Sequence, residues 1–430
     1  MFISRSSLWT IFNCRNADKT RVYLERSKSC SIGLWMIKTN ILSPGDPFLQ
    51  VIPHSIGRLK SLSVAGTPEN LQGITAHLSH HAPLLERLVI DGSLRPGRNP
   101  TLTATLFNGD LSSLRTFYLQ SVYTQLPWRN MVNLTTFVLH RMPSDGLSIR
   151  QLLDFFESAP RLRKIKLDHA TPASGGQNGR LVSLTCLKKM EISWGLPSSP
   201  LLDHLLIPVG AKLTEWVDSF DRLIEDNLPK SLDNLRNISN FTEIYFQTFE
   251  GNTRIQLSGS SGKLKLCIVS PIGNTWSGLE SLAQLDTSKV KRLEVVSSIR
   301  SFIRLPCRAL LPLESLRTLR LSRCKNPRTF LVALHPNPGT SEVVTCPKLE
   351  ELVLVPHTNV EEFDIGSVTE IAAARALRGA KLRTIRIVGG RDKLDPRSVL
   401  ELRKHVLQVE YDPEVGVVDD GESDDSDEEY

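Results

Sequence analysis

Three histidines lie at a spacing that could hold a metal ion. His77, His80 and His81 stand at positions i, i+3 and i+4, and a helix there would bring their imidazole rings onto one face. A zinc site needs three or four protein ligands, and cysteine or carboxylate groups usually complete the set. No such group stands at a diagnostic distance from these histidines, so the pattern favours a solvated histidine face and predicts no metal centre.

The other motifs that carry enzyme chemistry are incomplete. The segment closest to a phosphate-binding loop, Gly259-Ser-Ser-Gly262-Lys263, lacks the spacing of the G-x-x-x-x-G-K-[ST] motif. The H-E-x-x-H motif of metalloproteases and the G-x-S-x-G motif of hydrolases are both absent from the sequence. Because no nucleophile, metal or phosphate motif converges, we expect a protein that is not an enzyme and needs no cofactor.

The cysteines indicate a reducing compartment. Their number, seven, is odd, and no two of them form a C-x-x-C pair, which disfavours a secreted disulfide framework and a zinc ribbon. No uninterrupted apolar stretch approaches the roughly 20 residues of a membrane helix, and residues 1–12 lack a small-residue cleavage site. We therefore expect a cytoplasmic or nuclear protein that makes no membrane contact. The seven are Cys14, Cys30, Cys186, Cys267, Cys307, Cys324 and Cys346.

The charges are distributed unevenly along the chain. Residues 412–430 hold ten acidic side chains and no lysine or arginine, so residues 1–411 carry +16 within a whole-chain net charge of +6. A basic body with an acidic tail can indicate nucleic-acid binding, but the cations are scattered singly, as on a solvated surface. The basic run 161–166 is interrupted by Leu162 and Ile165, two expected core residues, which favours a structural role over nuclear localisation. We expect no nucleic-acid partner.

The acidic tail is predicted to be disordered because it offers almost no apolar surface to bury. Ser423 and Ser426 lie in the run Glu-Ser-Asp-Asp-Ser-Asp-Glu-Glu, which is the type of site that acidophilic kinases prefer. Both serines are therefore phosphorylation candidates, and phosphate would deepen the negative field. The alternative is a tail that only solubilises the protein.

One apolar phrase, L-x-x-L-x-L with aliphatic or aromatic substitutes, recurs along the chain. The central apolar residues run from Leu62 to Ile385 in twelve steps, a mean of about 27 residues, which lies within the range of leucine-rich repeats. Two longer gaps hold degraded copies, Leu213-x-x-Trp216 and Leu266-x-Ile268. Complete copies begin at Leu59, Leu85, Leu114, Leu134, Leu162, Leu187, Phe241, Val290, Leu316, Leu349 and Leu382.

Each repeat is predicted to contain a strand and a helix. The alternation x-L-x-L is typical of a short strand with one buried face, and the residues between copies often carry helix-start signals. No single repeat can bury its apolar face, so neighbouring repeats must stack. The helix-start signals are two capping boxes, Ser148 with Gln151 and Ser367 with Glu370, and two caps followed by proline, Thr67–Pro68 and Asp395–Pro396.

Stacking of these repeats predicts an α/β fold, a leucine-rich-repeat solenoid. Its strands would form a curved parallel sheet on the concave face, and its helices would cover the convex face. The expected organisation is an N-terminal segment, residues 1–50, that caps the array, followed by the solenoid, residues 51–411, and the tail, residues 412–430. The Gly- and Pro-containing residues 171–180 are expected to form an exposed connector.

The concave face is the expected binding surface. On an alternating strand, the variable positions that flank the buried residues point to solvent, and exposed tyrosine and arginine are frequent anchors for protein partners. We predict a protein partner on this face. The candidate residues are Arg87, Tyr118, His140, Lys164, Lys166, Asp168, Lys189, Glu191, Tyr245, Arg320 and Arg386.

Four stretches carry a family resemblance that extends over nearly the whole chain. They are SLWTIFNCRNADKTRVYLERSKS, SIGRLKSLSV, LLDFFESAPRLRKIKLD and CPKLEELVLVP. In phrasing and order they resemble F-box proteins with leucine-rich repeats from mushroom-forming (basidiomycete) fungi. In that family an N-terminal F-box of about three helices binds the Skp adaptor of a cullin ubiquitin ligase, and a phrase similar to Ser7-Leu8-Trp9 commonly follows it.

The resemblance implies a substrate-recognition subunit of a Skp–cullin–F-box ubiquitin ligase, which holds a protein while the ligase supplies the chemistry. Only seven residues precede Leu8 in this sequence, so residues 1–50 are interpreted as the segment that follows a lost F-box. We therefore expect an F-box-less remnant that binds the Skp adaptor weakly or not at all. The alternative is a stand-alone leucine-rich-repeat binding protein unrelated to ubiquitination.

Overall fold

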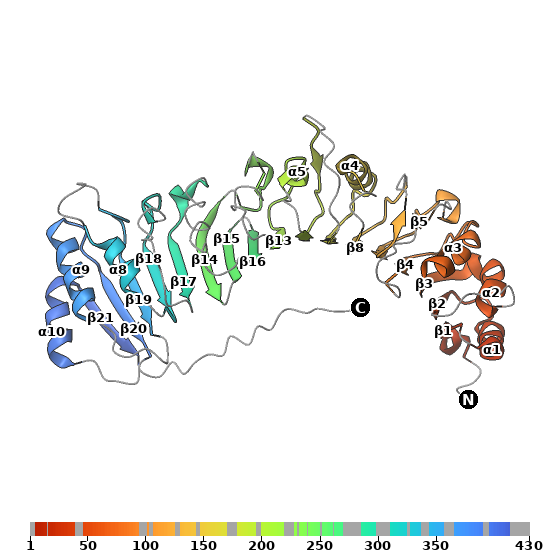
Figure 1. Ribbon diagram of the computed structural model, residues 1–430, viewed down its shortest axis with the longest axis horizontal. Coiled ribbons are helices and arrows are strands. Elements are labelled where there is room, and N and C mark those ends of the chain that lie inside the picture. The colour runs from red at the N-terminus through yellow and green to blue at the C-terminus, as the bar shows by residue number, and fades with distance from the viewer. Residues whose placement is uncertain are drawn as a thin grey trace. The chain divides into compact units, whose positions relative to one another are not determined.

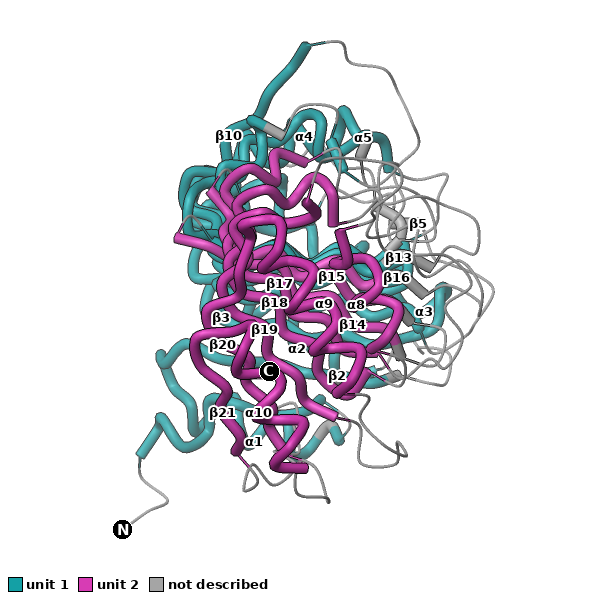
Figure 2. Tube along the Cα trace, turned by 90° about the vertical axis from the view of Figure 1, so that its left-hand side faces the viewer, with its two compact units in different colours: residues 1–219, 226–239, 261–264 teal, residues 220–225, 240–260, 265–430 magenta. Residues whose placement is uncertain are grey.

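The computed structural model divides the chain into two compact units. Unit 1 comprises Met1–Ser219, Asp226–Ser239 and Ser261–Leu264, and unit 2 comprises Phe220–Glu225, Asn240–Ser260 and Lys265–Tyr430 (Figure 2). The structure describes residues 5–14, 16–38, 46–93, 101–102, 106–124, 130–142, 147–169, 179–194, 199–218, 228–229, 232–238, 240–249, 252–260, 262–269, 285–297, 310–324, 327–336, 344–356, 365–389 and 395–412.

Unit 1 is built around a parallel sheet whose strands follow the chain order. Each main strand pairs in parallel with the next one in sequence. Two smaller parallel pairs, β5–β7 and β10–β12, form separate ladders. The main strands are β1 (Ile11–Asn13), β2 (Ile32–Lys38), β3 (Leu59–Gly66), β4 (Arg87–Asp91), β6 (Thr116–Gln120), β8 (Thr136–His140), β9 (Lys164–Asp168), β11 (Lys189–Trp194) and β13 (Lys212–Asp218).

Helices connect some of these strands and shorter segments connect others. In Figure 1, α1, α2 and α3 lie together on one side of the strands β1 to β4. The expected helix therefore follows some of the strands and not others. The connecting elements are α1 (Ala17–Ser27), α2 (Pro47–Ser55), α3 (Pro68–Ala76), α4 (Ile149–Ser158), α5 (Ser199–Leu202), the 3₁₀ turns η2 (Ser6–Trp9), η3 (Ile56–Arg58), η4 (Leu106–Gly109) and η6 (Leu232–Asn234), and the short strands β5 (Thr101–Leu102), β7 (Tyr123–Thr124), β10 (Val182–Ser183) and β12 (Leu205–Leu206).

The inward side of the unit 1 sheet consists of two rows of buried residues that run across the strands. The strand registers place the central residue of each apolar phrase opposite the central residue of the next, for example Phe117 opposite Phe137 and Phe137 opposite Ile165. Phe137 also packs against Phe155 of α4 with the rings tilted, and the ring centroids are 4.2 Å apart. The first row is Leu34, Leu62, Leu88, Phe117, Phe137, Ile165, Met190 and Leu213, each at most 2% exposed.

A turn of constant geometry precedes most strands in both units. The backbone N–H of the residue that leads each apolar phrase donates to a carbonyl three residues earlier, as Leu134 does to Met131 and Leu316 to Leu313. Both members of each such pair are buried, so the turn carries two core residues into the sheet. The other examples are Leu85 to Ala82, Leu114 to Leu111, Leu162 to Ala159, Leu187 to Leu184, Val290 to Thr287 and Leu349 to Cys346.

The strands of unit 2 are mostly parallel and again follow the chain order. Strand β14 pairs in parallel with β17, and each later strand pairs in parallel with the next. Helices α8, α9 and α10 lie together beside strands β18 to β21 (Figure 1). The elements are β14 (Phe241–Phe249), β15 (Asn252–Gly259), β17 (Arg292–Ser297), β18 (Thr318–Ser322), β19 (Glu351–Val355), β20 (Thr384–Val388), β21 (Gln408–Asp412), α8 (Arg328–Leu334), α9 (Ile365–Leu377), α10 (Pro396–His405) and the 3₁₀ turn η8 (Thr287–Lys289); β16 (Gly262–Val269) is divided between the two units.

The prediction of a purely parallel sheet is wrong at β14. This strand pairs with β15 in antiparallel register, with Phe246 opposite Ile255. Only residues 250 and 251 separate the two strands, which is too short for a parallel crossover and is the length of a hairpin connection. The expected α/β class, a mostly parallel sheet with helices, is confirmed in each unit.

One degraded repeat copy was placed three residues out of register by the sequence pattern. The strand pairing sets Leu213 opposite Met190 and Glu215 opposite Ile192. Leu213 is therefore the central residue of its repeat, and Trp216, which the pattern assigned to the core, is 46% exposed. The carboxyl of Glu215, 1% exposed, occupies the position that is aliphatic in the neighbouring strands.

Two helix predictions also need correction. Ser367 and Glu370 both lie inside α9, which begins at Ile365, so Ser367 is not an N-cap. The three histidines share no helix, because α3 ends at Ala76 and His77 is its C-cap. By contrast, Thr67 and Asp395 are N-caps followed by proline, as predicted.

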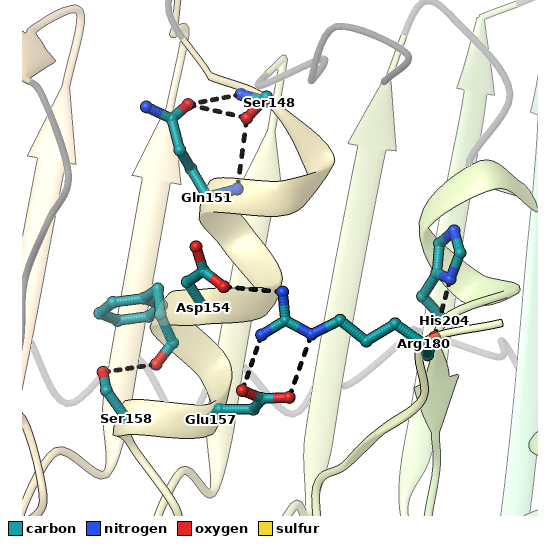
Figure 3. Close-up of polar contacts among 8 residues, drawn as sticks. Ser148, Gln151, Asp154, Glu157, Ser158, Arg180 and His204 are labelled. Atoms are coloured by element: carbon teal, nitrogen blue, oxygen red, sulfur yellow. Dashed lines mark hydrogen bonds and ion pairs between the residues drawn. The ribbon is translucent and has the colours of Figure 1, made fainter. Parts of the chain in front are cut away.

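The predicted capping box of α4 is present (Figure 3). The backbone N–H of Gln151 donates to Ser148 Oγ at 3.2 Å, and the Ser148 N–H donates to Gln151 Oε1 at 2.8 Å. These bonds satisfy two N–H groups that the first turn of a helix leaves open. The buried side of α4 carries Leu152, Phe155 and Phe156 into the core.

Ser148→Ala is expected to lower the free energy of unfolding of unit 1 by about 1 kcal/mol, since an N-cap oxygen is worth roughly that much. Urea titration followed by circular dichroism would measure the change. Ser148→Asp keeps an acceptor oxygen at the N-cap and should stay close to wild type. Equal losses in both variants would show that the cap is not the cause.

Arg180 ties the end of the 171–180 segment to α4. Its guanidinium forms two bonds with Glu157, at 3.1 and 2.6 Å, and one with Asp154 at 2.7 Å (Figure 3). These hydrogen bonds and charges raise the pKa of Arg180 above its ordinary value. The carbonyl of Arg180 bonds to Nδ1 of His204 at 2.8 Å. Apart from Gly179 and Arg180, the expected connector lies outside the described residues.

A second arginine, Arg375 of α9, is completely buried in unit 2. Its Nη1 donates to the carbonyl of Thr345 at 2.7 Å and more weakly to that of Leu334 at 3.5 Å, and its Nη2 donates to the carbonyl of Cys346 at 2.8 Å. Leu334 is the last residue of α8, so the guanidinium caps the end of one helix and the turn before β19. Burial lowers the pKa of Arg375.

Most of the described cysteines fill core positions. Cys14, Cys267, Cys324 and Cys346 are buried, and the six described cysteines are all free. Burial raises the pKa of the thiols of Cys14, Cys324 and Cys346 to about 12 in each case, so these thiols stay protonated at neutral pH. Within the described part of the chain, no helix is both long enough and apolar enough to cross a membrane.

Candidate protein-interaction surface

The eleven predicted binding residues all lie on strands, at positions that are not buried. Eight belong to unit 1, on β4, β6, β8, β9 and β11, and three belong to unit 2, on β14, β18 and β20. In each strand they alternate with the buried residues of the apolar phrase, so they share the outward side of the sheet in their unit. Arg87 and Arg386 are the most exposed of the set.

The outward side of β8, β9, β11 and β13 in unit 1 is rich in lysine, and we call it the lysine face. Strand register places Lys164 of β9 opposite Lys189 of β11, and Lys189 opposite Lys212 of β13. Lys166 lies one row further along β9, opposite Glu191. Adjacent strands of a sheet are about 4.8 Å apart, so three lysines stand side by side in one row.

The cations of the lysine face are only partly neutralised. Lys189 Nζ lies 2.6 Å from Glu191 Oε1 on the same strand. Among the described residues, Lys164, Lys166 and Lys212 form no ion pair within 4.0 Å. Like charges placed directly opposite each other destabilise a sheet. The repulsion among Lys164, Lys189 and Lys212 is therefore only partly compensated by the described residues.

His140 and Asp168 form the next outward row of the lysine face. His140 Nε2 lies 3.3 Å from Asp168 Oδ2, and His169 Nε2 lies 3.7 Å from Asp168 Oδ1. Burial lowers the pKa of His140 below 6.5; Asp168 opposes this shift, and the nearby cations Arg141 and Lys166 add to it. Despite the nearby carboxylate, burial therefore favours the neutral form of His140.

This lowered pKa predicts a pH dependence of stability. Between the folded pKa of His140 and the ordinary value near 6.5, the unfolded chain binds more protons, so stability is lost as the pH falls through this window. We expect His140→Gln to flatten the dependence of the melting temperature on pH as the pH falls below about 6.5. An imidazole titration by NMR that gave a pKa above 6.5 would contradict the assignment.

In unit 2 the outward charges are paired with one another. The registers form one row, in which Tyr245 lies opposite Glu294, and Glu294 opposite Arg320. Arg320 Nε lies 3.1 Å from Glu294 Oε1 and 2.9 Å from Ser322 Oγ. Arg386 continues the row and lies 2.7 Å from Glu410 Oε2. The predicted residues Tyr245, Arg320 and Arg386 are therefore part of an internally neutralised face.

The sequence pattern missed two outward residues of unit 1, Lys212 and Trp216. Both lie on β13, where the register error had assigned Trp216 to the core. Spacing did not reveal the error: a step of 25 residues, as from Ile165 to Met190, falls on Glu215 when it is repeated from Met190, which is closer to Trp216 than to Leu213. An exposed tryptophan is a frequent anchor in protein interfaces.

The remaining sequence candidates do not converge on a site. His81 bonds to Asp110 at 2.5 Å, whereas His77 lies at the end of α3. The described residues include no group of three or more His, Cys, Asp or Glu side chains placed to bind a metal ion. Gly259 and Gly262 stand at the end of β15 and the start of β16. Ser423 and Ser426, with the tail from residue 413 onwards, lie outside the described residues.

Comparison with known proteins adds no assignment: no protein-family model matches the chain, and no curated protein matches it significantly.

Proposed function

We propose that this chain is a non-catalytic protein-interaction scaffold with leucine-rich-repeat architecture. The observation that supports this most is the set of outward rows. Strands joined by a repeated turn present side chains in register, so neighbouring repeats offer one continuous surface in each unit. The repeated pairing of consecutive strands at the spacing of the apolar phrase favours a solenoid.

Within that class, we propose a substrate-recognition subunit, or an F-box-less remnant of one, in a Skp–cullin–F-box ubiquitin ligase. This part rests on the sequence resemblance. The alternative is a stand-alone binding protein. The described parts of residues 5–58 belong to the sheet of unit 1 rather than to a bundle of helices. There, α1 and α2 alternate with β1 and β2 (Figure 1), and β2 pairs directly with β3 of the same sheet.

The scaffold proposal is tested by affinity capture followed by mass spectrometry. We expect a variant with Tyr118→Ala, Tyr245→Ala and Arg320→Ala to lose partners that the wild-type chain retains. The matched control carries Leu377→Ala, Arg378→Ala and Leu400→Ala, three exposed positions on or directly after α9 and on α10. Identical partner sets for the face variant and the wild type would contradict the choice of surface.

The ligase proposal is tested with purified Skp adaptor. We expect weak or no binding by size-exclusion chromatography, while capture of protein partners persists. Strong adaptor binding would contradict the remnant and favour a complete recognition subunit. Ubiquitination of a captured partner that is unchanged when this chain is depleted from cells would favour the stand-alone alternative.

A further inference from the structure

The lysine face of unit 1 differs from the outward face of unit 2 in how its charges are satisfied. In unit 2 the strand register sets opposite charges side by side, as with Glu294 and Arg320. In unit 1 the equivalent register sets Lys164, Lys189 and Lys212 in one row. Lys189 is the member of that row with a carboxylate within 4.0 Å among the described residues.

A bound anion can relieve the repulsion among the three lysines of this row. Lysines on neighbouring strands, about 4.8 Å apart, repel each other even in water. An anion bound above the row would interact favourably with several ammonium groups at once. The geometry therefore favours a partner that supplies closely spaced negative charges.

The residues around the lysines favour an acidic peptide over a nucleic acid as the bound anion. Glu191 lies opposite Lys166, and Asp168 lies one row further along β9, opposite Ser193. Both carboxylates would repel the continuous phosphates of a nucleic acid. A peptide can place separate carboxylates on flexible side chains and avoid them. All four cations of the lysine face are lysines, which act as point charges and impose no two-pronged geometry on the bound anion.

An exposed aromatic residue adds an apolar contact on the same face as the cations. Trp216 lies opposite Ser193 of β11, and Ser193 lies opposite Asp168 of β9. Its indole is 46% exposed. Tryptophan is among the residues that most often dominate the energy of protein interfaces. A peptide with an apolar side chain beside its acidic run would use both features.

We infer that the lysine face binds a protein segment carrying a run of Asp and Glu residues. This inference rests on the proposed scaffold function and names the chemistry of the partner. Lys164, Lys166 and Lys212 contact its carboxylates, and Trp216 packs against an apolar side chain next to the acidic run.

The test is fluorescence anisotropy with the full chain and a labelled acidic peptide of about twelve residues, a length that spans the row when extended. The face variant carries Lys164→Gln, Lys166→Gln and Lys212→Gln. The matched control carries Lys348→Gln, Arg378→Gln and Lys381→Gln, which are exposed positions outside the strands of unit 2. Both variants lose three positive charges.

We expect the face variant to bind the acidic peptide about tenfold more weakly, and the control to change by less than about twofold. Raising the salt concentration from about 50 to 200 mM should weaken wild-type binding and shrink the difference between the variants. Trp216→Ala should weaken binding at both salt concentrations.

Four results would overturn the inference: no binding of the acidic peptide, equal binding of an Asn- and Gln-containing peptide, equal losses in the two variants, or tighter binding of single-stranded DNA of similar length. The scaffold proposal is judged separately. If the acidic peptide fails to bind but the Tyr118, Tyr245 and Arg320 variant still loses protein partners, the inference is wrong and the scaffold proposal stands.

Discussion

Leu319→Arg is expected to unfold unit 2. The side chain of Leu319 is completely buried on β18, between Leu293 of β17 and Leu352 of β19 in the strand register. Truncating such a leucine alone costs about 2–5 kcal/mol, and arginine adds the penalty of an unpaired charge in an apolar seam. The sum exceeds about 5 kcal/mol, which is comparable to the whole stability of a typical domain.

Differential scanning calorimetry of the full chain would measure this effect as the loss of one unfolding transition. Leu400→Arg on α10 is the matched control, because Leu400 is 61% exposed and surface substitutions usually change stability by less than about 0.5 kcal/mol. An unchanged melting temperature for Leu319→Arg would mean that the strand register of unit 2 is wrong.

Arg375→Met is expected to destabilise unit 2 by about 2–5 kcal/mol. Methionine has a similar length and removes a buried charge, which by itself is favourable. It also leaves the carbonyls of Thr345 and Cys346 without the donors that lie 2.7 and 2.8 Å away. Each buried acceptor left unsatisfied costs about 1–3 kcal/mol, so the loss of the two donors outweighs the gain.

Urea denaturation of the full chain, monitored by circular dichroism, would measure the change. Arg378→Met provides the control, since Arg378 is exposed directly after the same helix and should unfold at the same urea concentration as wild type. Arg375→Lys should fall between the two, because one ammonium group cannot replace both guanidinium donors. A stable Arg375→Met variant would show that the carbonyls find other donors.

The buried positions of the sheet were predictable wherever the apolar phrase is complete. A residue such as Leu134 or Leu316 leads an alternating run, and the period of the strand alone decides which neighbours face inward. The same period gave the outward positions, including the lysines of β9 and β11. Features that depend only on local alternation are therefore visible in the sequence.

The register of β13 was not predictable from composition, because the phrase there is degraded. Trp216 has an apolar side chain and stands three residues after Leu213, so it imitates a core position. Its exposure follows from the register in which β13 pairs with β11. That register depends on both strands, so the sequence of β13 alone does not reveal it. The burial of Glu215 has the same origin, since no local signal predicts a carboxylate in an aliphatic row.

Two further features were missed because the local sequence does not determine them. They are the hairpin between β14 and β15, and the role of Arg375. Apolar and polar residues alternate in the run 252–259 as in the other strands, so the apolar pattern does not indicate whether this strand runs parallel or antiparallel to β14. The two-residue connection sets the antiparallel direction. At Ser367 the sequence predicted a feature that the structure lacks. The spacing from Ser367 to Glu370 matches a capping box, but α9 begins at Ile365, so Ser367 is not its N-cap. Arg375 lies in an alanine-rich helix, where arginine is ordinarily a surface residue.

The pairing of consecutive strands in unit 1 has a consequence for how this unit folds. Strand partners are close in sequence, from 20 residues apart for Phe117 and Phe137 to 29 for Leu88 and Phe117. Closing such short loops costs little entropy, so this parallel sheet has a low contact order for its size. Any adjacent pair of strands can serve as the nucleus, and growth can proceed outward in both directions. We therefore expect substitutions in β3 and in β11 to slow folding to similar, modest extents.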